Sequence, residues 1–262
     1  MIVWKSILLG LLQGVTEFLP ISSSGHLVIL KSLLNVRYPG ISFEVFVHVA
    51  TLLAILYVFR ARVASITRAI LRPRAPAAKE NLNLLYLILL ANLPSAVVGL
   101  TLRQKVEQMF ERPDVVGIAL LLTGFYVFAT RFARGTDREL RVLDALLIGV
   151  AQAAALLPGV SRSGATISTA LVLGLGREKS AEFCFLVAVP AILGAAVLEM
   201  GHLLEGAQDV QVLGYSAGFL AAFISGFAAI KLVLLVLRVR RFADFAYYCW
   251  AVGVFVLLWT MS

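Results

Sequence analysis

Long uninterrupted apolar runs dominate the chain, and six of them are long enough to be membrane-spanning helices. A hydrocarbon core of about 30 Å needs roughly 20 mainly apolar residues in a helix. Runs such as VFVHVATLLAILYVF lack the polar face that a helix of a soluble protein would keep. The predicted spans are 42–59, 83–101, 115–131, 180–200, 213–236 and 244–261.

Two further regions, 5–34 and 143–176, each contain a pair of apolar helices that are too short to span comfortably. The helices of each pair are joined by a segment rich in Pro, Ser and Gly, LPISSSG in the first and LPGVSRSG in the second. Proline removes a backbone donor and serine hydroxyls compete for backbone hydrogen bonds, so both segments favour a helix break. We therefore predict two re-entrant helical hairpins.

The two hairpins resemble one another at a constant offset of 139 positions. LLGLLQ at 8–13 aligns with LIGVAQ at 147–152, and ISSSG at 21–25 aligns with VSRSG at 160–164. In this alignment Ser23 corresponds to Arg162. We predict an inverted-topology repeat with halves at about 1–131 and 132–262 and with polar tips that meet near the midplane. The predicted fold class is all-α integral membrane, with six transmembrane helices plus the two hairpins in a single polytopic domain, 1–262.

Composition and charge agree with a membrane protein and predict its orientation. Charged residues make up 15% of the chain and the mean hydropathy is +0.92, whereas soluble domains carry about 25% charged residues. The net charge of +8 comes from Lys and Arg in short loops, without a nucleic-acid-binding motif, so we expect no nucleic-acid partner. The positive-inside rule places 60–79, 131–141 and 238–241 in the cytoplasm and 201–212 outside. The first hairpin then enters from outside and the second from the cytoplasm.

Polar side chains stand at the tips of both apolar hairpins, where each charged group costs about 2.5 to 3.5 kcal/mol unless it is paired or hydrated. The first tip holds Glu17, Ser22, Ser23, Ser24, Gly25 and His26, and the second holds Ser161, Arg162, Ser163, Gly164 and Thr166. Hydroxyls, helix N-termini and the guanidinium fork all bind phosphate oxygens. A salt bridge between the hairpins would explain the charges but not the hydroxyls. The tips therefore predict a site for a polyprenyl phosphate or diphosphate, or for another lipid phosphate.

Individual residues of the first tip suggest separate roles. Gln13 and Glu17 share a helix face because they are four residues apart. Glu17 together with substrate oxygens suffices for a divalent cation such as Mg²⁺ or Ca²⁺, and Gln13 adds a carbonyl oxygen. His26 can move a proton near neutral pH, and a serine near it is a candidate nucleophile. A His26 that only caps or hydrogen-bonds a turn is the alternative.

The segments QGVTEFLPISSSGHL and PGVSRSGAT resemble the two signatures of the undecaprenyl-diphosphatase family of membrane phosphatases, also called the bacitracin-resistance family. FEVFVHVATLLA at 43–54 and EFCFLVAVPAILGA at 182–195 resemble further family segments, so the likeness covers most of the chain. The resemblance implies hydrolysis of undecaprenyl diphosphate to undecaprenyl phosphate, the lipid carrier for cell-wall precursors. It also implies a bacterial cytoplasmic membrane, a site open to the outer face, and dependence on divalent cations.

The resemblance also assigns site residues. Glu17, Ser23, His26 and Arg162 become the catalytic set, with Glu17 as metal ligand and Arg162 as phosphate clamp. Gln13 stands where many family members have glutamate, which puts a two-carboxylate metal site in doubt. The substrate-binding set is Gln13, Ser22, Ser24, Gly25, Ser161, Ser163, Gly164 and Thr166. In the implied mechanism Ser23 or a water attacks the terminal phosphorus, while His26 takes or gives the proton.

A polyprenyl-phosphate transporter or flippase is the alternative function, because inverted repeats with broken helices at the midplane are typical of secondary transporters. Glu44, His48, Glu182 and Lys231 could then belong to an ion path. Transport needs an anion site but no nucleophile and proton donor beside it, which favours hydrolysis. The sequence leaves the metal ion and the oligomeric state open, a homodimer included.

Overall fold

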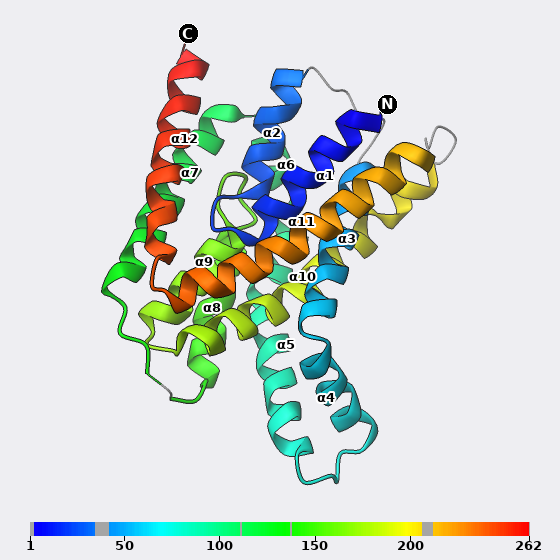
Figure 1. Cartoon of the computed structure of the whole chain (residues 1–262), viewed down its shortest axis with the longest axis vertical. Coiled ribbons are helices and arrows are strands. Elements are labelled where there is room, and N and C mark those ends of the chain that lie inside the picture. The colour runs from blue at the N-terminus through cyan, green and yellow to red at the C-terminus, as the bar shows by residue number, and fades with distance from the viewer. Residues whose placement is uncertain (1–2, 35–41, 111, 137, 206–211, 262) are drawn as a thin grey trace.

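The computed structural model describes residues 3–34, 42–110, 112–136, 138–205 and 212–261, and the regular elements of these residues are helices (Figure 1). Two 3₁₀-helices, η1 (Thr130–Phe132) and η3 (Phe242–Asp244), extend or precede α-helices. The α-helices are α1 (Val3–Phe18), α2 (Ser23–Leu34), α3 (Ser42–Val58), α4 (Arg60–Leu71), α5 (Ala78–Thr101), α6 (Arg103–Met109), α7 (Pro113–Ala129), α8 (Val142–Ala154), α9 (Arg162–Val172), α10 (Arg177–Glu205), α11 (Val212–Arg238) and α12 (Phe245–Met261).

Five of these helices are long and apolar enough to cross a membrane: α5, α7 with η1, α10, α11, and α12 with η3. A sixth span results if α3 and α4 count as one bent pair. The chain is therefore a multi-pass membrane protein. Each of the six predicted spans coincides with one of the helices α3, α5, α7, α10, α11 and α12, apart from a few residues at the ends.

The segment 60–79 was predicted as a loop, but most of it forms the helix α4. The sequence RARVASITRAIL is rich in residues with good helix propensity. The chain bends by 82° between α3 and α4, and Ile66 and Ala69 are then buried where α4 packs on α5. The short helix α6 was also not predicted. Hydropathy identifies spans, but it does not identify amphipathic helices that lie beside them.

The two short helix pairs break at the predicted Pro-Ser-Gly segments. α1 ends at Phe18 and α2 begins at Ser23, while α8 ends at Ala154 and α9 begins at Arg162. The hydroxyl of Ser163 donates a hydrogen bond to the Leu19 carbonyl oxygen at 3.0 Å, which joins the second break to the first. The structure thus brings the two polar segments together, although they are about 140 residues apart in the sequence.

Helix α1 lies unusually close to α11, and this contact fixes the helix that carries Glu17. A Cβ atom on Gly10 would come within 2.1 Å of the Gly218 carbonyl oxygen, and one on Gly14 would come within 2.4 Å of the Ala222 carbonyl oxygen. Glycine at both positions, four residues apart on one face, therefore lets the two backbones pack closely. Figure 1 shows α11 running beside α1 and crossing α3.

Several of the basic segments gather around the start of α10. Arg62 of α4 pairs with Glu182, and Arg238 at the end of α11 pairs with Glu178 at 2.9 Å. The Thr136 amide donates to the Gly174 carbonyl oxygen, just before α10, at 2.9 Å. The predicted cytoplasmic segments thus lie near one another, whereas half of the predicted outer loop 201–212, residues 206–211, lies outside the described residues.

The ion pair between Arg138 and Asp144, at the start of α8, leads to a prediction about stability. Arg138 donates two hydrogen bonds to Asp144, at 2.6 and 2.9 Å, and the Arg141 amide donates a third at 2.8 Å. The Arg138 hydrogen bonds hold the pKa of the Asp144 carboxyl below its usual value. A lowered pKa in the folded state stabilises the protein above the unfolded-state pKa of about 3.9, and this contribution is lost as the pH falls through the folded-state pKa.

We therefore expect Asp144→Asn to lower the free energy of unfolding by about 2 kcal/mol at pH 7, the size of a charged hydrogen bond. Thermal unfolding in detergent at pH 7 and at several pH values below about 3.9 would measure this, and the difference from wild type should shrink as the pH falls through the folded-state pKa of Asp144. Asp114→Asn is the control, because Asp114 pairs with Arg112 at an exposed position. Equal effects of both variants would contradict the prediction.

Candidate active site

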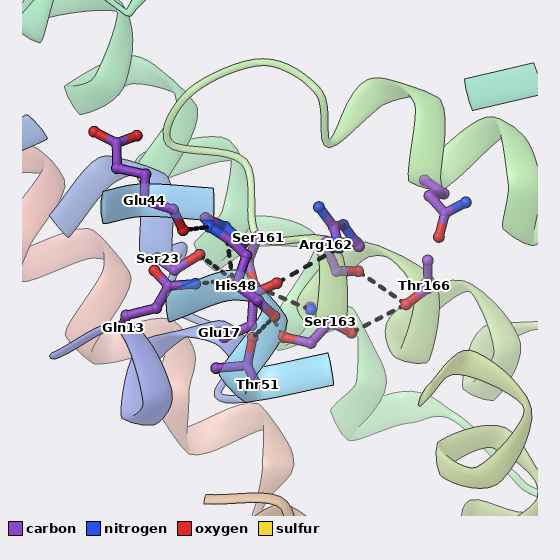
Figure 2. A network of polar contacts seen from close by, with 12 residues as sticks. Gln13, Glu17, Ser23, Glu44, His48, Thr51, Ser161, Arg162, Ser163 and Thr166 are labelled. Atoms are coloured by element: carbon purple, nitrogen blue, oxygen red, sulfur yellow. Dashed lines mark hydrogen bonds and ion pairs between the residues drawn. The ribbon is translucent and has the colours of Figure 1, made fainter. Parts of the chain in front are cut away.

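Glu17, on the last turn of α1, is the centre of a buried polar cluster (Figure 2). Its Oε2 atom accepts hydrogen bonds from the Ser23 hydroxyl at 2.6 Å and from the Gln13 amide at 3.0 Å. Its Oε1 atom lies 3.5 Å from Nη1 of Arg162, and His48 Nε2 lies 3.8 Å from Oε2. Four side chains from α1, α2, α3 and α9 therefore surround one carboxylate, and the guanidinium offsets much of the cost of burying it.

A cavity of about 620 Å³ opens next to this cluster. Its polar lining includes Glu17, Ser23, His48 and Arg162, together with Ser24 and Ser161. The remaining walls are mainly apolar side chains of α2, α10 and the segment between α8 and α9, together with Val45 and Phe110, and they also include Thr16, Glu44 and Glu107. We call this cavity the chamber. A chamber with one polar end and apolar walls suits a ligand with a polar head and an apolar tail.

The polar end of the chamber is built from the starts of two helices. Ser23 is the first residue of α2 and Arg162 is the first residue of α9. Amide N–H groups at a helix start have no partner within the helix, and the helix dipole places partial positive charge there. Two helix starts, a guanidinium and hydroxyls are groups that can bind an anion such as a phosphate group.

His48 was not predicted as a residue of this site, although it lies beside Glu17. It is on α3, and its Nδ1 atom lies 2.7 Å from the Glu44 carbonyl oxygen. A carbonyl oxygen only accepts, so Nδ1 carries the hydrogen and Nε2 faces Glu17. The segment FEVFVHVATLLA pointed to α3, but only its packing against α1 shows which side chain reaches the carboxylate.

His26 is not brought to this cluster, contrary to the expectation that it stands beside the reacting serine. Its Nδ1 atom lies 2.8 Å from the Ser22 carbonyl oxygen, and its Nε2 atom lies 2.7 Å from the Tyr248 hydroxyl on α12. It is not among the residues that line the chamber. Spacing alone placed His26 near Ser23, but the side chain turns back toward its own helix start.

Of the predicted substrate-binding residues, Ser24 and Ser161 line the chamber. The others do not line it, and several of them form hydrogen bonds near its polar end. Ser22 and Ser161 cap α2 and α9, because their hydroxyls accept from the Gly25 and Gly164 amides at 3.3 and 3.1 Å. Ser163 is bonded to Leu19, as described above. Thr166 donates to the Arg162 carbonyl oxygen at 2.8 Å, and Gln13 donates to Glu17.

Oxygen ligands for a divalent cation are few at this site. Among the described residues, no group of three or more His, Cys, Asp or Glu side chains could hold a metal ion. The Gln13 amide oxygen is buried and has no hydrogen-bond partner in the described part of the chain, and Gln13 is bonded to Glu17. Mg²⁺ often takes one or two carboxylates and completes its shell with phosphate oxygens and water. The residues thus fit a cation bound mainly by its substrate, with Glu17 and Gln13 as protein ligands.

Sequence comparisons place this chain among known proteins. The family described as "Bacitracin resistance protein BacA" matches residues 6–255. An undecaprenyl-diphosphatase of Carboxydothermus hydrogenoformans is 37% identical over 261 residues, which cover 97% of this chain and 96% of that protein. Undecaprenyl-diphosphatases of Syntrophotalea carbinolica and Korarchaeum cryptofilum are 40% and 39% identical, over 95% and 97% of each chain.

Proposed function

Since the chain belongs to the bacitracin resistance protein BacA family and is an undecaprenyl-diphosphatase, we propose that the chamber around Glu17 is its active site. The observation that carries the proposal is the contact between Ser23 and Glu17. A hydroxyl that donates to a buried carboxylate at 2.6 Å is arranged to lose its proton, and the Arg162 guanidinium stands on the other side of the same carboxylate.

In the proposed reaction, the diphosphate of the lipid binds at the two helix starts and Arg162, with the polyprenyl tail along the apolar walls of the chamber. The Ser23 hydroxyl oxygen attacks the terminal phosphorus and its proton moves to Glu17. The bond between this phosphorus and the bridging oxygen breaks, and undecaprenyl phosphate leaves. Water then hydrolyses the phosphoserine, which releases inorganic phosphate and returns the proton to Ser23. The fixed positive groups stabilise the charge on the phosphoryl oxygens throughout.

The proposed orientation opens the active site to the outer face of the membrane. The chamber is lined by Glu44 at the start of α3 and by Glu107 and Phe110 at α6. The other end of α3 leads into the basic segment with α4, so the chamber opens away from it. Basic segments stay in the cytoplasm, and a site that opens at the opposite end faces outward. The hairpins around the two breaks are accordingly re-entrant, and their caps Ser22 and Ser161 occupy equivalent positions of an inverted repeat.

Phosphate release from undecaprenyl diphosphate by the detergent-purified protein tests this function. We expect the wild type to release phosphate, and rapid acid quenching followed by peptide mass spectrometry to find phosphoserine at Ser23. Release without phosphoserine, at full rate in Ser23→Ala, would assign the attack to water instead. A folded wild type that releases no phosphate with Mg²⁺ present would favour a transporter that uses the chamber as an anion site.

A divalent cation, when bound, would neutralise charge on the phosphoryl oxygens, with Glu17 and Gln13 as its protein ligands. We expect a chelator to lower phosphate release at least about tenfold, because several kcal/mol of charge stabilisation would be lost. Added Mg²⁺ or Ca²⁺ should restore the rate. Full activity after chelation and gel filtration into metal-free buffer would contradict the need for a cation.

A further inference from the structure

Ser22, the residue directly before Ser23, has an unusual backbone conformation. Its φ is +68°, and it is one of two non-glycine residues with positive φ in the described part of the chain. An L-residue in the left-handed region is uncommon and strained, and it persists only where its surroundings hold it there. Ser22 is also buried, with 2% of its surface exposed. Its conformation sets the direction in which the next residue leaves the turn.

The second hairpin provides an internal comparison. Ser161 occupies the equivalent position, and both serines cap their helix through a glycine amide three residues later. Ser161 nevertheless has φ −77° and ψ 120°, the extended conformation that is usual for a helix cap. Capping alone therefore does not require the left-handed conformation of Ser22. Four residues after each cap, the first hairpin has His26 and the second has Ala165.

His26 binds back to this turn and is itself held by another helix. Its Nδ1 atom lies 2.8 Å from the Ser22 carbonyl oxygen, which can only accept, so Nδ1 carries the hydrogen. In the neutral imidazole Nε2 is then an acceptor, and the Tyr248 hydroxyl donates to it at 2.7 Å. The two rings are also stacked, with centroids 5.6 Å apart and planes inclined by 10°. The Ser22 carbonyl thus fixes the tautomer of His26, and Tyr248 fixes its orientation.

We infer that His26 and Tyr248 are a positioning pair, which holds Ser22 in its left-handed conformation and thereby aims the Ser23 hydroxyl at Glu17. The inference rests on the proposed function, since it concerns how the nucleophile of that reaction is oriented. His26 acts through Ser22 and does not touch the reacting atoms. Tyr248 comes from α12, far from Ser23 in the sequence, so the reaction depends on a helix that does not line the chamber.

Two substitutions of His26 separate positioning from proton transfer. The amide nitrogen of asparagine can replace Nδ1 as donor to the Ser22 carbonyl, but asparagine does not titrate. His26→Asn, which loses only the contact with Tyr248, should therefore keep kcat within about tenfold of wild type, with an unchanged pH profile. His26→Ala removes the donor and should lower kcat about 100-fold with little change in KM, the expected cost of a nucleophile displaced by about 1 Å.

Tyr248→Phe removes one hydrogen bond to His26 and should lower kcat about fivefold. It should have no further effect in the His26→Ala background, because the two residues act through one contact. Tyr247→Phe is the matched control. Tyr247 is the neighbouring tyrosine on α12, packs against Phe128 and Trp250, and should leave kcat unchanged.

The outcomes distinguish this inference from the proposed function. If the wild type releases phosphate, and His26→Asn is folded but as slow as His26→Ala, His26 transfers a proton and the positioning role is overturned. Full activity of His26→Ala would overturn it as well. If the folded wild type itself releases no phosphate, the proposed function fails instead. Retained melting temperature in detergent shows that each variant is folded.

Discussion

Glu17→Gln is expected to lower kcat for phosphate release from undecaprenyl diphosphate about 10³-fold. The amide has the size of the carboxylate and can still accept a hydrogen bond from Ser23 and face Arg162. It cannot take the proton of the attacking hydroxyl, and loss of a general base costs about 10²- to 10⁴-fold. Steady-state phosphate release at saturating substrate measures the effect, and rapid-quench labelling should show that phosphoserine no longer forms at Ser23.

The control for this variant is Glu178→Gln. Glu178 is an exposed glutamate that pairs with Arg238 on the surface, where an ion pair contributes little. Its activity should equal that of the wild type. Activity of Glu17→Gln within about tenfold of the wild type would show that the carboxylate does not act as the base.

Arg162→Lys is expected to lower kcat/KM at least 100-fold, although the charge is kept. The guanidinium presents a planar fork that binds two phosphate oxygens, whereas the lysine ammonium is a point charge on a flexible stem. Arg162 is the first residue of α9 and lines the chamber, so its fork and the helix start would act on the same phosphate. Losing one donor of this kind costs about 10²- to 10³-fold. A rise in KM together with a fall in kcat would show that Arg162 acts on both the bound diphosphate and the transition state.

Arg238→Lys is the matched control, because Arg238 is the partner of Glu178 in the same exposed ion pair. It should leave both kcat and KM unchanged. If Arg162→Lys also kept its kcat/KM, the diphosphate would have to be held by the helix starts and hydroxyls alone. The phosphate clamp assigned to Arg162 would then be wrong.

Local sequence patterns were sufficient to predict the membrane-spanning helices and the positions of the two helix breaks. The six spans follow from hydropathy, which depends only on the run of residues, and the breaks follow from Pro20, Pro158 and the serines beside them. The polar residues of the hairpin tips could be predicted as site residues for a similar reason. A charge in an apolar segment is costly wherever the segment lies, so Glu17 and Arg162 had to be paired or functional.

Two features of the structure depend on packing between distant segments and could not be read from a local pattern. His48 reaches Glu17 because α3 packs on α1, and nothing in the spacing within α3 selects that residue. The placement of α4 follows from an 82° bend after α3, which leaves Ile66 and Ala69 buried, and hydropathy does not show such a bend.

The run of residues alone is enough to identify a multi-pass helical membrane protein with Glu17, Ser23 and Arg162 at or beside its two polar breaks. Which histidine faces the carboxylate depends on how the helices pack. A side chain's direction depends on its backbone conformation and on its partners across the fold. His26 contacts the Ser22 carbonyl oxygen and the Tyr248 hydroxyl, away from the chamber, while the packing of α3 on α1 brings His48 to Glu17.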